Sequence, residues 1–209
     1  MRVLVATIFL TFISNNLFAQ SAWKSFWKLS SFEKSWVITH PCIAEKVFQI
    51  TNTARKEALK MESDSTLDRD PQGGQVDAFR HAYWMALLSQ HMCWKKAIKL
   101  GAAHERGNYR QFKRSKSEEG EIPDSISSVM DIFNNHTGAI IGCNNKSLSE
   151  DDLKQKITNA ILHGNMRIIA KNGNGLPIDN HGNVIEIKGK KNTWNIPKYL
   201  IPSDLQHKK

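Results

Sequence analysis

Three short polar clusters stand in otherwise apolar sequence, and they carry the residue types that perform chemistry in proteins. They are residues 77–84 (DAFRHAYW), residues 102–105 (AAHE) and residues 130–138 (MDIFNNHTG). Positions 77, 80, 81 and 84 have the i, i+3, i+4, i+7 spacing of one helical face, and positions 131, 134, 135 and 138 repeat that spacing. Because asparagine favours caps and turns over helix interiors, two adjacent asparagines in a helix point to contacts made by their side chains.

Imidazole nitrogens and carboxylate oxygens are the ligands that divalent metals take from proteins. The predicted metal ligands are Asp77, His81, His104 and Asp131. An ion held there would lower the pKa of a bound water and make it a nucleophile near neutral pH. The predicted catalytic residues are Arg80, which would hold a phosphate, with His81, His104 and Glu105. Asn134 and Asn135 are predicted to bind substrate or to orient the groups around the metal.

A different interpretation of the same residues remains open. Apolar residues such as Val76 and Phe79 cover the adjoining face of the first cluster, so its charged side chains should be partly buried. Buried charges need partners, and a polar network can satisfy itself and fix helix packing without chemistry. The shared-site interpretation requires the clusters to converge, with Asp77 and His81 close to His104 and Asp131.

Two resemblances bear on these motifs. The order His81, His104-Glu105, Asp131 resembles the His, His-Asp, Asp order of the helical HD-type metal phosphohydrolases, with Glu105 in place of an aspartate. The combined motifs of residues 77–84, 103–105 and 130–138 look more like a bacterial family classed as a domain of unknown function, seen in exported proteins. That resemblance covers roughly residues 31–142 and implies no established activity.

The elements expected to position these clusters are mostly helical. Ser30 and Glu33 fit a capping box, Pro41 suits the first turn of the next helix, and residues 64–74 read as a loop. Further helices are expected over about 75–91, 93–107 and 123–142, with residues 108–122 as a surface loop. A last helix is expected to follow a capping box at Ser147 and Glu150 and to run past Ile168 to about residue 172.

The predicted fold class is therefore mostly α: a compact domain of about six helices with a short irregular or β-hairpin C-terminal tail. The expected divisions are a signal peptide at 1–19, a helical domain at 20–171 and the tail at 172–209. In the tail, residues 184–187 and 193–196 are expected to form strands joined by a turn at Gly189.

The N-terminus has the three-part layout of a secretory signal, which predicts a secreted or periplasmic protein. Arg2 precedes an apolar run over residues 3–13, and Ala19 offers a cleavage site before Gln20. An N-terminal membrane anchor is the alternative, although the run is shorter than the ~20 residues of a spanning helix. No later stretch is long and apolar enough to span a membrane, so no transmembrane segment is expected after cleavage.

The charge balance favours an anionic partner. The chain has 29 basic and 20 acidic residues, a net charge of +9, and residues 95–116 contain eight Lys or Arg and one acid. An anionic envelope polymer, a lipid head group or a nucleic acid would suit this surface, whereas solvated lysines that maintain solubility are the alternative. The leading functional hypothesis is a hydrolase-like, metal-dependent protein acting on an anionic substrate. The other hypothesis is a non-enzymatic binding module of the cell envelope.

Overall fold

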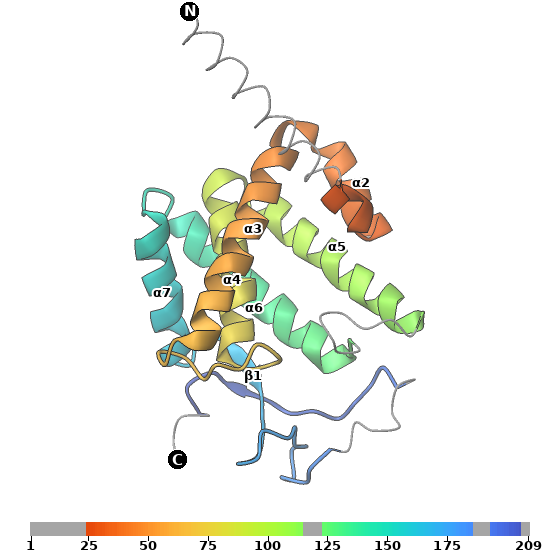
Figure 1. Cartoon of the computed structure of the whole chain (residues 1–209), viewed down its shortest axis with the longest axis vertical. Coiled ribbons are helices and arrows are strands. Elements are labelled where there is room, and N and C mark those ends of the chain that lie inside the picture. Colours follow the sequence, from red (N-terminus) through yellow and green to blue (C-terminus); the bar gives the residue numbers. More distant parts are fainter. Residues whose placement is uncertain (1–23, 115–122, 186–192, 206–209) are drawn as a thin grey trace, which may run out of the picture.

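The mostly α fold predicted from the sequence is confirmed. The computed structural model describes residues 24–114, 123–185 and 193–205 (Figure 1). Its helices are α2 (Ser31–Thr39), α3 (Pro41–Ser63), α4 (Gln75–His91), α5 (Trp94–Lys113), α6 (Ser125–Asn144) and α7 (Glu150–Leu162), and residues 24–28 are helical as well. The strands are β1 (Arg167–Ile169) and β2 (Leu200–Pro202). The proposed signal peptide lies outside the described residues.

Helix α4 is the centre of the domain, and four helices cover it. It packs against α3, α5, α6 and α7, and most of its residues are buried. The contact with α6 is the closest, because two glycines of α6 lie directly on the α4 backbone. A Cβ at Gly138 would lie 2.1 Å from the carbonyl oxygen of Ala82, and one at Gly142 would lie 2.0 Å from that of Ala86. The two glycines of α6 therefore let it approach the α4 backbone closely, so that polar side chains of the two helices can contact one another.

The first residues of several helices are set by local features, namely side-chain caps and a proline. The Ser30 hydroxyl accepts from the backbone N–H of Glu33 and the Glu33 carboxylate accepts from that of Ser30, so the predicted capping box is present. Helix α3 begins at Pro41 as expected. The cap of α7 was predicted at the wrong serine: Ser149, not Ser147, accepts from the N–H of Asp152.

The C-terminal part contains the expected antiparallel strand pair, but at other residues than the sequence indicated. Helix α7 ends at Leu162 because Gly164 adopts a left-handed φ of +76°, so Ile168 belongs to a strand and not to that helix. The two strands are β1 and β2, paired antiparallel with Ile168 opposite Ile201. Residues 193–196 form no strand, Val184 makes only an isolated bridge with Ile178, and the proposed turn at Gly189 lies outside the described residues.

Ser203, directly after β2, fastens the end of the tail to the helical core. Its backbone N–H donates to the Met166 carbonyl at 3.1 Å, and its hydroxyl donates to the Ile161 carbonyl at 2.6 Å. Its own carbonyl accepts from the side-chain amide of Gln75, the first residue of α4, at 2.7 Å. The tail is therefore an integral part of the domain.

Helix α5 is longer than the sequence indicated, since it continues from the expected end near residue 107 to Lys113. Over the described residues, no helix combines the length and the apolar character needed to cross a bilayer. Cys42, Cys93 and Cys143 are free cysteines.

Candidate metal centre

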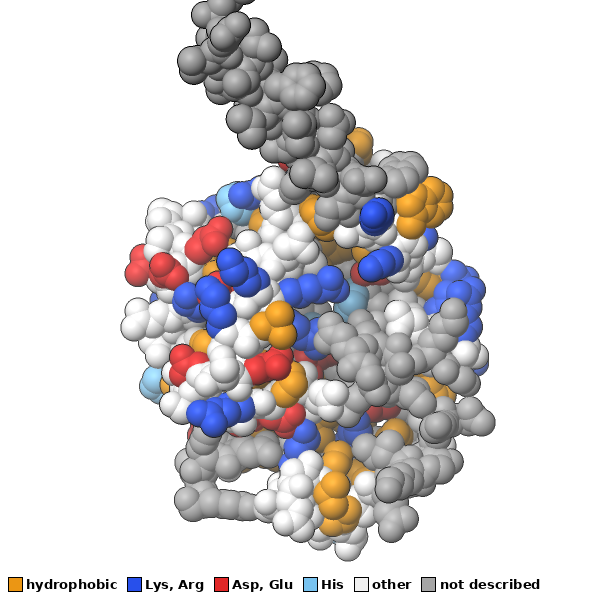
Figure 2. All heavy atoms as spheres, in the orientation of Figure 1, with side chains coloured by type: hydrophobic (Ala, Val, Ile, Leu, Met, Phe, Trp, Pro, Cys, Tyr) orange, Lys and Arg blue, Asp and Glu red, His pale blue; other side chains and the backbone are white. Residues whose placement is uncertain are grey.

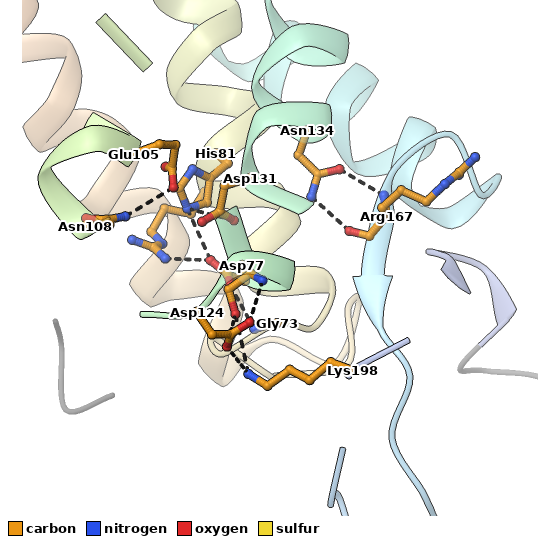
Figure 3. A network of polar contacts seen from close by, with 12 residues as sticks. Gly73, Asp77, His81, Glu105, Asn108, Asp124, Asp131, Asn134, Arg167 and Lys198 are labelled. Atoms are coloured by element: carbon orange, nitrogen blue, oxygen red, sulfur yellow. Dashed lines mark hydrogen bonds and ion pairs between the residues drawn. The ribbon is translucent and has the colours of Figure 1, made fainter. Parts of the chain in front are cut away.

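Helices α4 and α6, which pack closely, bring Asp77, His81 and Asp131 together (Figure 3). The His81 Nε2 atom lies 3.5 Å from Oδ1 of Asp77 and 3.4 Å from Oδ1 of Asp131. One ligand atom from each residue falls within 4.8 Å of the other two. The imidazole is 4% exposed and the two carboxylates about a tenth, so all three side chains are largely shielded from solvent.

Asp77 is held as an ionised carboxylate by its neighbours. Its Oδ1 accepts from the Arg80 guanidinium at 2.5 Å, and its Oδ2 accepts from the backbone N–H of Gly73 at 2.8 Å. Burial alone would raise the pKa of Asp77, but the charge of Arg80 and these two hydrogen bonds keep that pKa below its ordinary value. The Arg80 guanidinium therefore binds the Asp77 carboxylate in this structure.

His81 is held neutral. Burial and the positive charge of Arg80 outweigh the attraction of Asp77 and lower the pKa of His81 to about 3. The Nδ1 atom of the ring is buried and makes no hydrogen bond with any described residue. Neutral imidazole is the form that coordinates a metal, so His81 is in its ligand state at physiological pH.

The separations within the cluster suit a bound cation better than direct hydrogen bonds. Distances of 3.4 and 3.5 Å exceed the usual 2.7–3.2 Å of an N–H···O hydrogen bond. A tetrahedral ion with ligands at ~2.1 Å places any two ligand atoms ~3.4 Å apart. Two carboxylates that converge on one buried imidazole nitrogen also supply the negative charge that a divalent cation requires.

His104 lies beside this cluster but faces another residue. Its ring centroid is 6.3 Å from that of His81, and its Nδ1 atom lies 3.0 Å from Oε1 of Glu33 on α2. Burial would raise the pKa of Glu33, but the hydrogen bond and charge of His104, with the bonds from Ser30, lower it to about 2. The structure thus groups three of the four predicted metal ligands and couples the fourth to α2.

Glu33 is the partner that the sequence did not reveal. The sequence pointed to Glu33 only as part of the capping box of α2, and 71 residues separate Glu33 from His104. One glutamate therefore both caps α2 and fixes the imidazole of α5, and only the second task depends on the tertiary fold. Glu105, the residue after His104, is buried and accepts from the Asn108 side chain at 3.3 Å.

The two adjacent asparagines of α6 have different surroundings. The Asn134 amide donates to the carbonyl of Arg167 and accepts from its N–H, both at 2.9 Å, so it pairs with the β1 backbone as a neighbouring strand would (Figure 3). Asn135 is buried next to His81, and its interaction with the ring favours the protonated imidazole. Of the two predicted substrate-binding residues, only Asn135 is directed to the cluster.

A second buried charge pair stabilises the start of α6 near the cluster. Asp124 caps α6 by accepting from the backbone N–H groups of Ile126 and Ser127. Its carboxylate also binds the Lys198 ammonium at 2.6 Å, and both side chains are at most 5% exposed. The C-terminal segment thus fixes the helix that carries Asp131 (Figure 3).

Taken together, the fold is a helical domain whose central helix pair presents two carboxylates and a neutral imidazole at one buried point. The chain belongs to a family named only as a domain of unknown function, DUF6973, whose model matches residues 34–165. Neither the curated proteins nor the solved structures contain a match to this chain. The matched segment contains the three clustered residues, whereas β1, β2 and Lys198 lie beyond it.

Proposed function

We propose that the protein is an exported, metal-dependent hydrolase that acts on an anionic substrate, with Asp77, His81 and Asp131 as the metal ligands. The observation that carries the proposal is the convergence of these three ligand atoms from two helices at spacings that suit a bound cation. A divalent ion there would supply a water of lowered pKa as the nucleophile.

The protein groups around the cluster have separate parts in this proposal. Arg80 fixes the Asp77 carboxylate, so it would orient a ligand and not hold a substrate phosphate directly. Asn135 and Glu105 are two further buried polar groups near the cluster, and they would position a substrate or accept a proton. Asn134 is assigned to the β1 backbone, because both of its amide atoms are engaged there.

The competing explanation is a structural network, and calorimetry separates the two. Purified protein without its first 19 residues is titrated with zinc, manganese and calcium, beside thermal melts. Asp131→Asn and His81→Ala should abolish binding of the preferred ion and hydrolysis of bis(p-nitrophenyl) phosphate. Asp151→Asn is the matched control, since it removes a carboxylate that is 90% exposed on α7. Absence of binding by the wild type, with a lowered melting temperature in His81→Ala, would leave only the packing role.

Export is proposed on the N-terminal sequence alone, namely Arg2, the apolar residues 3–13 and Ala19. Mass spectrometry of the protein from its native host should find a mature N-terminus near Gln20. A soluble cytoplasmic protein that retains Met1 would refute the proposal.

A further inference from the structure

A basic cleft lies between α2 and the C-terminal half of α5. Its volume is about 390 Å³, and it is lined by Phe32, Arg106, Tyr109, Arg110, Lys113 and Arg114. The four cationic side chains are exposed, and Tyr109 is 42% exposed. Figure 2 shows Lys and Arg side chains gathered at the right-hand edge of the molecule, where α5 ends in Figure 1.

The cationic side chains lie in a row and do not converge on one point. Arg106, Arg110 and Arg114 are spaced i, i+4, i+8, so they follow one line along α5 for ~12 Å at 1.5 Å per residue. None of the four cationic side chains pairs with a carboxylate from the part of the chain that the structure describes. A row of exposed cations favours a linear polyanion over one isolated anion.

Aromatic rings accompany this row. The Arg110 guanidinium lies 5.2 Å from the centroid of the Phe32 ring, and the Lys113 ammonium lies 5.4 Å from that of Tyr109. Trp194 meets the Tyr109 ring edge-on with centroids 4.8 Å apart, which holds the tyrosine in place. Only Tyr109 among these rings is exposed, and an exposed ring among cations is the pattern by which proteins stack the bases and contact the phosphates of single strands. A single strand would use both features of the cleft, since its phosphates meet the cations and its bases can stack on an exposed ring.

We propose that this cleft binds single-stranded nucleic acid, with the α5 cations on the phosphates and Tyr109 stacked on a base. The proposal goes beyond the hydrolase, since binding here needs neither a metal nor Asp77, His81 and Asp131. If both proposals hold, α5 would connect them, because it carries His104 and Glu105 on its buried side and the cleft on its exposed side.

The test is fluorescence anisotropy with a labelled dT oligonucleotide of about twelve nucleotides, within the ~4–16 nucleotides of known single-strand sites. The full mature chain is used in EDTA, so a failure of the metal proposal cannot affect the result. Four phosphate contacts predict a slope of about −2.8 for log K against log salt concentration. The double variant Arg106→Gln/Arg114→Gln should reduce that slope by about 1.4.

Two further variants distinguish binding of the oligonucleotide in this cleft from its nonspecific electrostatic attraction to a basic protein. Lys96→Gln/Lys99→Gln removes the same charge from exposed positions of α5 outside the cleft, so it should bind almost as the wild type does. Tyr109→Leu should weaken binding by about tenfold through the loss of stacking, with the salt slope unchanged. Equal losses in the two double variants would overturn the proposal. So would no binding at low salt, or binding to phosphatidylglycerol vesicles without binding to the oligonucleotide.

Discussion

Replacing Gly138 by alanine should separate the two helices that form the candidate metal centre. The added Cβ would lie 2.1 Å from the Ala82 carbonyl oxygen and 2.6 Å from the Ala82 Cα atom, where ordinary contacts begin near 3.4 Å. The obstructing atoms are backbone, so no side-chain rotation relieves the clash. The helices must therefore move apart by about 1 Å, and dispersion contacts along the interface forfeit a quarter to a half of their energy over such a gap.

The expected magnitude follows from two opposing effects. Overpacking in a close-packed core typically costs about 1–3 kcal/mol, and this contact with rigid backbone belongs at or above the upper end. Alanine recovers about 1 kcal/mol through its better helix propensity. The net loss should be about 2 kcal/mol or more, which lowers the melting temperature by about 4–8 °C for a chain of this size.

Differential scanning calorimetry of three variants tests this reasoning. Gly142→Ala should behave like Gly138→Ala, since its Cβ would lie 2.0 Å from the Ala86 carbonyl oxygen. Gly101→Ala is the control, because it is also within a helix but its Cβ would meet first a side-chain atom, Nδ2 of Asn135, at 3.1 Å. Gly138→Ala should also weaken metal binding, since Asp131 would move away from His81. A Gly138→Ala protein that melts at or above the temperature of Gly101→Ala would refute the account.

The remaining predictions concern two ion pairs, Glu33 with His104 and Asp124 with Lys198. The pKa of Glu33 is about 2 in the folded protein, below its ordinary 4.5, so its stabilising effect is complete above pH 4.5 and is lost as the pH falls toward 2. Melts between pH 6 and 3 should therefore show a shallower loss of stability in Glu33→Gln than in the wild type, and parallel curves would count against this pairing. Lys198→Met should cost about 3–5 kcal/mol by leaving Asp124 buried without its cation, as measured by urea unfolding. Lys156→Met, at an exposed position of α7, should leave the unfolding midpoint nearly unchanged.

The sequence predicted the helices well because their signals are local. The period of apolar residues gave α4 its observed bounds, and the capping box at Ser30 and the proline at position 41 marked the starts of α2 and α3. The strands of the tail were predicted at the wrong residues because their pairing is non-local. β1 and β2 are separated by about thirty residues, and no pattern within either three-residue strand specifies the other.

The candidate site was likewise predictable where the signal is local and not where it depends on tertiary contacts. The helical spacing of Asp77 and His81 placed both on one face of α4, and a buried charge had to find partners, which pointed to Asp131. The direction of His104 could not be predicted, since it depends on where α2 packs. The role of Asn134 was hidden for a related reason: its partner is the backbone of Arg167, and a backbone group leaves no mark in the sequence.

The hydrogen bonds by which Ser203 fastens the tail to the helical core have a consequence for the order in which the molecule is completed during synthesis. Gln75 begins the central helix, yet its side-chain amide is bonded to a carbonyl 128 residues later. Residues 34–165 can leave the ribosome and form helices while this bond, the β1–β2 pairing and the Lys198 ion pair are still unmade. The domain therefore stays incompletely closed until Lys198 and Ser203 have emerged, so its central helix forms long before the contacts that complete its surroundings.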